Sequence, residues 1–70
     1  MKPVMLALSV VVPLFNEQDS LRPLVSQLLE AVRPLGVAFE LVLVDDGSKD
    51  ATATVLAELS DEVPELVAVL

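Results

Sequence analysis

The sequence predicts an α/β fold, in which a parallel sheet follows the chain order strand, helix, strand, helix, strand. Two observations predict it. Three short runs are almost wholly apolar, a pattern typical of strands that are covered on both faces. Between these runs, apolar residues recur at helical spacing. Segments that alternate in this way indicate parallel strands joined by helical crossovers, about 98% of which are right-handed.

The first strand is expected over residues 6–13, where three valines stand in a row. Pro13 should end it, because proline has no N–H for the strand ladder. The first helix should begin with Ser20 as N-cap and Pro23 in its first turn, and should stop at Pro34 and Gly36. Its apolar positions are Leu21, Leu24, Val25, Leu28, Leu29 and Val32.

The second strand is expected over residues 39–44 and runs into the turn Asp-Asp-Gly-Ser at 45–48. Ser48 or Asp50 should cap the second helix, which Ser60, Asp61 and Pro64 should end. The apolar face of that helix would be formed by Thr52, Val55, Leu56 and Leu59. A third strand begins at residues 66–70.

A three-stranded sheet with apolar residues on both faces leaves surface uncovered. We therefore expect residues 1–70 to be the N-terminal part of a larger domain. A core of this size supplies only about 3–5 kcal/mol, so the chain alone should be marginally stable or self-associate.

Composition excludes several classes of function. The 70 residues contain no Cys and no His, which excludes disulfides, thiol nucleophiles and a Ser-His-Asp triad within this sequence. Four basic residues against eleven acidic ones, a net charge of −7, argue against nucleic-acid binding. The sequence contains neither a P-loop nor a G-x-G-x-x-G motif.

An apolar run at residues 4–15 has the length of a signal-peptide core. Pro13 interrupts it, no small-residue cleavage site closes it, and Asn16 and Glu17 follow at once. A membrane-spanning helix needs about 20 apolar residues, which no stretch here reaches. We expect a cytoplasmic protein.

The predicted topology places two polar turns together. The carboxyl ends of parallel strands lie at one edge of the sheet, where ligands of open α/β sheets bind. Residues 13–17 and 45–48 should therefore face each other across one crevice.

These turns carry groups that suit a nucleoside. Asp46, an acceptor only when ionised, could accept from the ring N–H of uracil or the N–H edge of guanine. Glu17 could accept from two sugar hydroxyls, and Phe15 could stack on a base, a contact worth about 1–3 kcal/mol. Backbone N–H groups near Ser48 open a helix and could receive an anion.

Structural roles are open for some of the same residues. Ser48 and Asp45 could cap the second helix, and Asp50 could be a cap or a solvated charge. Asn16 could be a cap or turn residue, and Phe15 could fill the core.

The charge of the turns indicates a cation. Glu17, Asp45 and Asp46 together would repel a diphosphate, and Mg²⁺ or Mn²⁺ would resolve this repulsion. Two adjacent aspartates cannot form a full site, so further carboxylates would be needed from beyond residue 70.

Two stretches together resemble the start of family 2 glycosyltransferases. They read Val-Val-Val-Pro-Leu-Phe-Asn-Glu at 10–17 and Phe-Glu-Leu-Val-Leu-Val-Asp-Asp-Gly-Ser-Lys-Asp-Ala-Thr at 39–52. The branch most similar contains dolichyl-phosphate mannosyltransferase and bacterial polyprenyl-phosphate glycosyltransferases. The resemblance implies a Rossmann-like GT-A domain that transfers sugar from a UDP- or GDP-sugar to a glycan or polyprenyl-phosphate acceptor, using Mg²⁺ or Mn²⁺.

The resemblance implies that Pro13, Phe15 and Glu17 line a nucleoside pocket and that Asp46 reads the base; Ser48 completes our predicted nucleotide-binding set. Phe15 stands where the family often has Tyr. The family's Asp-x-Asp metal motif, its acceptor groups and any membrane segments would follow residue 70. Residues 1–70 alone are therefore expected to be inactive.

Two other interpretations stay open. A response-regulator receiver also places an acidic pair at a strand end, where it binds magnesium, although here the pair follows the second strand rather than the first. A non-catalytic fragment that only holds a nucleotide or a partner would also fit. The residues do not distinguish uracil from guanine.

Overall fold

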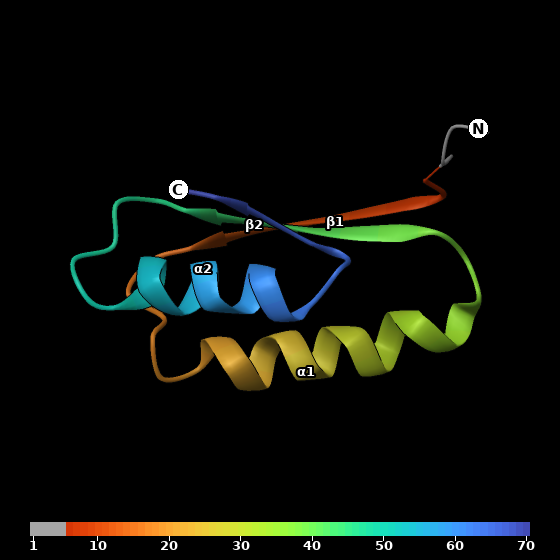
Figure 1. Ribbon diagram of the computed structural model, residues 1–70, viewed down its shortest axis with the longest axis horizontal. Coiled ribbons are helices and arrows are strands. Elements are labelled where there is room, and N and C mark those ends of the chain that lie inside the picture. Colours follow the sequence, from red (N-terminus) through yellow and green to blue (C-terminus); the bar gives the residue numbers. More distant parts are fainter. Residues whose placement is uncertain (1–5) are drawn as a thin grey trace.

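The computed structural model describes residues 6–70, so residues 4 and 5 of the apolar run at 4–15 lie outside the described part. The predicted order of strands and helices is confirmed (Figure 1). The elements are β1 (Leu8–Leu14), α1 (Leu21–Val32), a short 3₁₀ helix η1 (Arg33–Leu35), β2 (Phe39–Asp45), α2 (Thr52–Glu62) and β3 (Leu66–Val69).

The three strands form one parallel sheet in the order β1-β2-β3. Leu8 lies opposite Phe39 at one end of the β1–β2 pair, and Leu14 lies opposite Asp45 at the other. The turns that follow β1 and β2 therefore leave the sheet from neighbouring positions at the same edge, as the sequence predicts.

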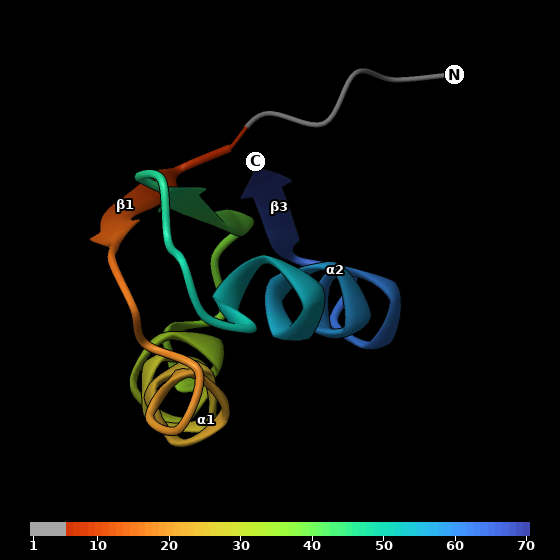
Figure 2. The same ribbon diagram turned by 90° about the vertical axis from the view of Figure 1, so that its left-hand side faces the viewer.

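Both helices pack on the same face of the sheet (Figure 2). The core between them and the sheet is formed by alternate strand residues and one stripe of each helix. Its members include Leu14, Leu21, Val25, Leu43, Leu56, Leu59 and Leu66.

The other face of the sheet is open in the described residues, with Val11, Val67 and Val69 exposed. This open face is the uncovered surface that the apolar pattern of the three strands predicts for residues 1–70. Both crossovers step in the same direction across the sheet, and two right-handed crossovers of that kind place their helices on one face.

Pro13 does not end the first strand, because β1 continues to Leu14 and Pro13 is paired with Val44. Backbone groups alternate in direction along a strand, and the Leu14 carbonyl accepts from Asp46 on the β2 side. The nitrogen of Pro13 therefore points to the free edge of β1, where a missing N–H breaks no ladder bond.

The second helix is longer than predicted. Ser60 and Asp61 lie inside α2, which ends at Glu62. Ser60 is tolerated because its hydroxyl donates to the Ala57 carbonyl at 2.8 Å, and Asp61 lies on the exposed side. Val63 is extended, as expected for a residue that precedes Pro64.

The predicted end of the first helix is confirmed. After α1, η1 closes on Gly36, which has a φ of 68° and donates its amide to the Arg33 carbonyl at 3.2 Å. A left-handed glycine after the last helical turn is a common helix ending.

Candidate functional site

The loops that follow β1 and β2 lie side by side at one end of the molecule (Figures 1 and 2). We call residues 15–20 the first loop and residues 46–51 the second loop. The Asp46 amide donates to the Leu14 carbonyl at 2.8 Å, which extends the β1–β2 pairing into the turn. The predicted proximity of the two turns is confirmed.

Three consecutive amides of the first loop donate to side chains that follow β2. Asn16 N donates to Ser48 Oγ at 2.9 Å, and Glu17 N donates to Thr52 Oγ1 at 2.8 Å. Gln18 N donates to Asp50 Oδ2 at a longer 3.4 Å. The backbone of the first loop is therefore held by the second loop and by the start of α2.

Two amides of the second loop donate in return to side chains of the first. Lys49 N donates to Asn16 Oδ1 at 2.9 Å, and Ala51 N donates to Gln18 Oε1 at 2.8 Å. Asn16 has a φ of 51°, a left-handed conformation that Asn adopts more readily than most residues. Asn16 is thus a turn residue that also bridges the loops.

Gln18 and Thr52 also join the loops, although no motif in the sequence marks them as bridging residues. The signal available was spacing alone: Asn16 and Gln18 stand two residues apart, as do Ser48 and Asp50. Such a match predicts a bridge only once the register of the two strands is known.

Four amides between Ser48 and the first residue of α2 are occupied within the chain. Ser48 N donates to Asp45 Oδ1 at 3.2 Å, and Thr52 N donates to Asp50 Oδ1 at 2.9 Å. Lys49 and Ala51 donate to the first loop. The expectation that amides near Ser48 receive an anion is therefore not supported for these four donors.

Of the residues that could cap the second helix, Asp50 contacts the first amide of α2 and Ser48 does not. Ser48 does not cap α2, because its hydroxyl oxygen accepts from Asn16 instead. Asp50 accepts from the first amide of α2 and from the Thr52 hydroxyl. These bonds, the Thr52 hydroxyl first among them, lower the pKa of the Asp50 carboxyl below its ordinary value of 3.8.

The side chains predicted to meet a nucleoside differ in exposure. Phe15 is 56% exposed, so the alternative that its ring fills the core is wrong. Pro13 and Asp46 are also exposed, and the Asp46 carboxylate makes no hydrogen bond or ion pair within residues 6–70. Glu17 is half-buried, and its carboxylate accepts from the Ser20 hydroxyl at 2.6 Å.

A hollow of about 410 Å³ lies between β1 and the start of α1. Two predicted site residues, Pro13 and Glu17, line it together with the apolar side chains of Val12, Leu14 and Leu24. The remaining lining comes from Ser20, Pro23 and Gln27. This hollow places apolar surface and one carboxylate beside the loops.

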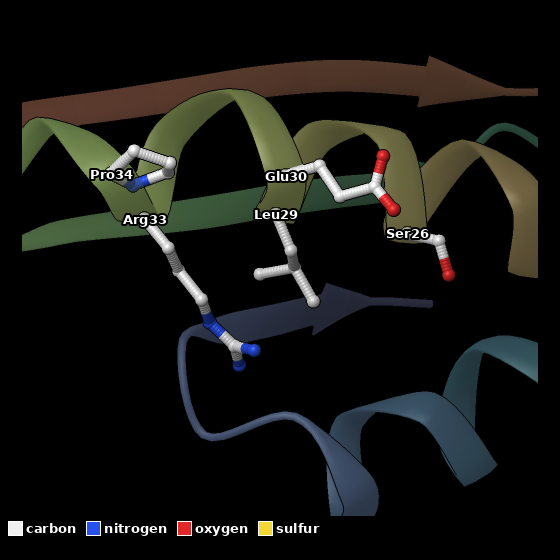
Figure 3. A pocket seen from close by; sticks show the side chains of 5 residues that line it. All are labelled: Ser26, Leu29, Glu30, Arg33 and Pro34. Atoms are coloured by element: carbon white, nitrogen blue, oxygen red, sulfur yellow. The ribbon is translucent and has the colours of Figure 1, made fainter.

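A second hollow, of about 440 Å³, lies on the C-terminal half of α1 (Figure 3). Ser26, Leu29, Glu30, Arg33 and Pro34 line it. Its Arg33 guanidinium is paired with the Glu65 carboxylate at 2.9 and 3.0 Å. This hollow is remote from the carboxyl ends of β1 and β2, and its one basic side chain, Arg33, is already paired with Glu65.

A metal site is not formed by the described residues. Residues 6–70 contain no group of three or more acidic side chains arranged to hold an ion. Nor is any helix within residues 6–70 long and apolar enough to cross a bilayer.

Comparison with known proteins identifies close relatives. A family model described as Glycosyl transferase family 2 matches residues 9–69. An undecaprenyl-phosphate 4-deoxy-4-formamido-L-arabinose transferase of Pectobacterium carotovorum is 46% identical over 63 residues, which is 89% of this chain and 19% of that protein. The enzyme of the same name from Edwardsiella ictaluri is 50% identical over 50 residues, 71% of this chain and 15% of that protein.

A further relative, from Synechocystis, is named as a glycosyltransferase and is 49% identical over 45 residues, 64% of this chain and 14% of that protein. The chain thus spans about a fifth or less of the length of these relatives. The match to the family model runs from β1 to the end of β3, so it includes both loops and all three strands.

Proposed function

The chain belongs to glycosyl transferase family 2, and from this membership we propose that it forms the nucleoside-binding part of a glycosyltransferase. The donor would be a UDP- or GDP-sugar. One observation supports this most directly: Phe15 and Asp46 are both exposed, and the parallel pairing of β1 with β2 brings their loops to the same edge of the sheet although they stand 31 positions apart in the chain.

In this proposal each of the five predicted site residues has one role. The Phe15 ring stacks on the base, and the Asp46 carboxylate accepts from a base N–H. Glu17 accepts from the ribose hydroxyls, Pro13 lines the pocket, and Ser48 holds the first loop through Asn16. A carboxylate suits both uracil and guanine, so UDP-sugars and GDP-sugars are both candidate donors.

We propose a polyprenyl phosphate as the acceptor, because the relatives from Pectobacterium and Edwardsiella are named as undecaprenyl-phosphate sugar transferases. Such an acceptor is anchored in a lipid bilayer. The enzyme would therefore work in the cytoplasm at a membrane surface. The glycan acceptor that the resemblance also allows is less well supported by these names.

In the overall reaction, a phosphate oxygen of the acceptor would form a bond to the anomeric carbon of the sugar, and the bond from that carbon to the nucleoside diphosphate would break, so that the nucleoside diphosphate leaves. Within residues 6–70, the proposed contribution is binding and orientation of the nucleoside. Mg²⁺ or Mn²⁺ would stabilise the leaving diphosphate. Its ligands and the acceptor-side groups are proposed to lie outside residues 1–70, in keeping with the far greater length of the relatives.

Membership of glycosyl transferase family 2 argues against the receiver interpretation. The family model covers residues 9–69, including the Pro13–Glu17 turn that a receiver would leave unexplained. A fragment that binds nucleotide without catalysis makes the same binding prediction as the enzyme, and turnover by the intact protein separates the two.

The proposal is tested by titrating the intact protein with UDP, GDP and phosphate, with and without Mn²⁺. Replacement Asp46→Ala removes a charged acceptor, so we expect the dissociation constant for the preferred nucleoside diphosphate to rise at least about tenfold. Asp61→Ala, which removes an exposed carboxylate at the far end of α2, is the matched control and should leave binding unchanged. Equal affinity of the Asp46→Ala variant and the parent would refute the base-reading role.

A further inference from the structure

We propose that Thr52 is a positioning residue for the nucleoside site, because its hydroxyl holds the backbone of Glu17 against the start of α2. The inference rests on the proposed function, in which the Glu17 carboxylate meets the ribose. It assigns a role to a side chain that faces the protein interior and is not itself expected to touch the ligand.

Thr52 is the buried polar residue among those described, with a relative exposure of 0%. A buried hydroxyl is costly unless its hydrogen-bonding capacity is used. Here the hydroxyl oxygen accepts a hydrogen bond from Glu17 N at 2.8 Å, and the hydroxyl donates a hydrogen bond to the Asp50 carboxylate. The bond to Glu17 joins residues that are 35 positions apart in the chain.

Asp50 determines the direction of this arrangement. An ionised carboxylate can only accept, so the Thr52 hydroxyl must donate to Asp50 and turn a lone pair toward the Glu17 amide. Asp50 also accepts from the amides of Thr52 and Gln18. The carboxylate therefore orients the hydroxyl and holds the neighbouring residue of the first loop.

Glu17 is held from two sides. Its carbonyl accepts from the amides of Ser20 at 3.1 Å and Leu21 at 2.9 Å, which ties it to the start of α1. Its own amide is tied to α2 through Thr52. Loss of the Thr52 oxygen should leave the α1 attachment in place and release Glu17 from α2, which would shift the carboxylate relative to Asp46.

Four variants of the intact protein test this role. Thr52→Val keeps the shape and removes the hydroxyl, whereas Thr52→Ser keeps the hydroxyl. Thr52→Ala and Thr52→Ser differ only in the hydroxyl oxygen, so this pair decides the test if Thr52→Val fails to fold. Thr54→Val makes the same change at an exposed position two residues further along α2 and is the control.

Two readouts are needed: hydrogen exchange at the Glu17 amide and the dissociation constant for the nucleoside diphosphate. We expect roughly tenfold changes in both for Thr52→Val, the size expected for loss of one buried hydrogen bond. Thr52→Ser and Thr54→Val should stay within about twofold of the parent.

Unchanged Glu17 exchange in Thr52→Val would overturn the proposal. Faster exchange with unchanged nucleotide affinity would also overturn it, because Thr52 would then be structural only. If the parent binds no nucleoside diphosphate, the proposed function fails, and the exchange rates alone decide whether Thr52 holds Glu17.

Discussion

Asn16, Gln18 and Ser48 show how individual polar residues near the strand ends are used. Their side chains accept hydrogen bonds from backbone amides of the opposite loop, so they hold the loops together. Phe15 and Asp46, which stand beside them, make no such bond within residues 6–70 and stay exposed. Adjacent residues therefore divide into those that build the site and those available to a ligand.

Gly47 allows a test at the level of one residue. It has a φ of 72°, and a Cβ added there would meet no atom within 4 Å, so alanine would be strained without clashing. We expect Gly47→Ala to lower the free energy of unfolding by about 1–2 kcal/mol and to weaken nucleoside diphosphate binding, because it displaces Asp46. Urea unfolding and the titration described above measure the two effects.

Gly36→Ala is the control for that prediction. Gly36 has a φ of 68° and equally open surroundings, so the loss of stability should be similar. Gly36 lies after η1, away from the loops, so nucleotide affinity should not change. Equal affinities of the two glycine variants would contradict the role given to the turn at Gly47.

The helices are attached to the sheet mainly by buried apolar side chains. Leu21 and Val25 of α1 and Leu56 of α2 are at most 2% exposed. The ion pairs of Arg22 with Glu58 and Glu62 join α1 to α2 at the surface, where such pairs contribute about 0–1 kcal/mol. At the start of α2, polar contacts matter more, because its first amides need acceptors.

Asp50, which accepts from the first amide of α2, makes the stability of this helix start depend on pH. Its pKa is lowered in the folded protein, chiefly by the Thr52 hydroxyl. The stabilisation is therefore present above the ordinary carboxyl value of 3.8 and is lost as pH falls below it. We expect the free energy of unfolding to decrease in this acid range, and Asp50→Asn to decrease less steeply.

Chemical denaturation between pH 7 and pH 3 would measure this dependence. The Glu65 carboxyl, whose pKa Arg33 lowers, contributes to the same acid loss, so Glu65→Gln should also flatten the curve. Asp61→Asn, at the exposed end of α2, serves as the control. Identical pH dependence of the parent and Asp50→Asn would contradict the role of Asp50.

At the scale of the whole molecule, the sheet has one covered and one open face. Val11 is 63% exposed and Val67 and Val69 are each 43% exposed, all on the face without helices. Exposed sheet surface of this kind favours association. The net charge of −7 opposes association but does not cover the valines.

We therefore expect residues 1–70, expressed alone, to self-associate as concentration rises. Val67→Thr should weaken this association, because it places a hydroxyl on the open face. Val37→Thr is a close control, since Val37 is 41% exposed but lies before β2, outside the sheet. Light scattering across a concentration series measures the effect, and a monomer at all concentrations would contradict the prediction.

Much of the fold was predictable because it depends on local patterns. The buried stripe Leu21, Val25 and Val32 follows helical spacing, and α1 starts directly after Ser20 as predicted, although the Ser20 hydroxyl donates to Glu17 and does not cap the helix. The end of α1 follows from the left-handed Gly36 after η1. The boundaries that failed, at Pro13 and Ser60, depended on what lay beside them. Pro13 faces a free edge, and Ser60 satisfies its hydroxyl on its own helix.

The sequence by itself determined the order of elements, the placement of both acidic turns after parallel strands, and the family, because apolar periodicity and short motifs are written along the chain. Only the tertiary structure decided that both helices share one face and that Thr52, Asp50 and Gln18 join the loops. These contacts link residues more than thirty positions apart. They depend on strand register and crossover direction, which no local pattern encodes.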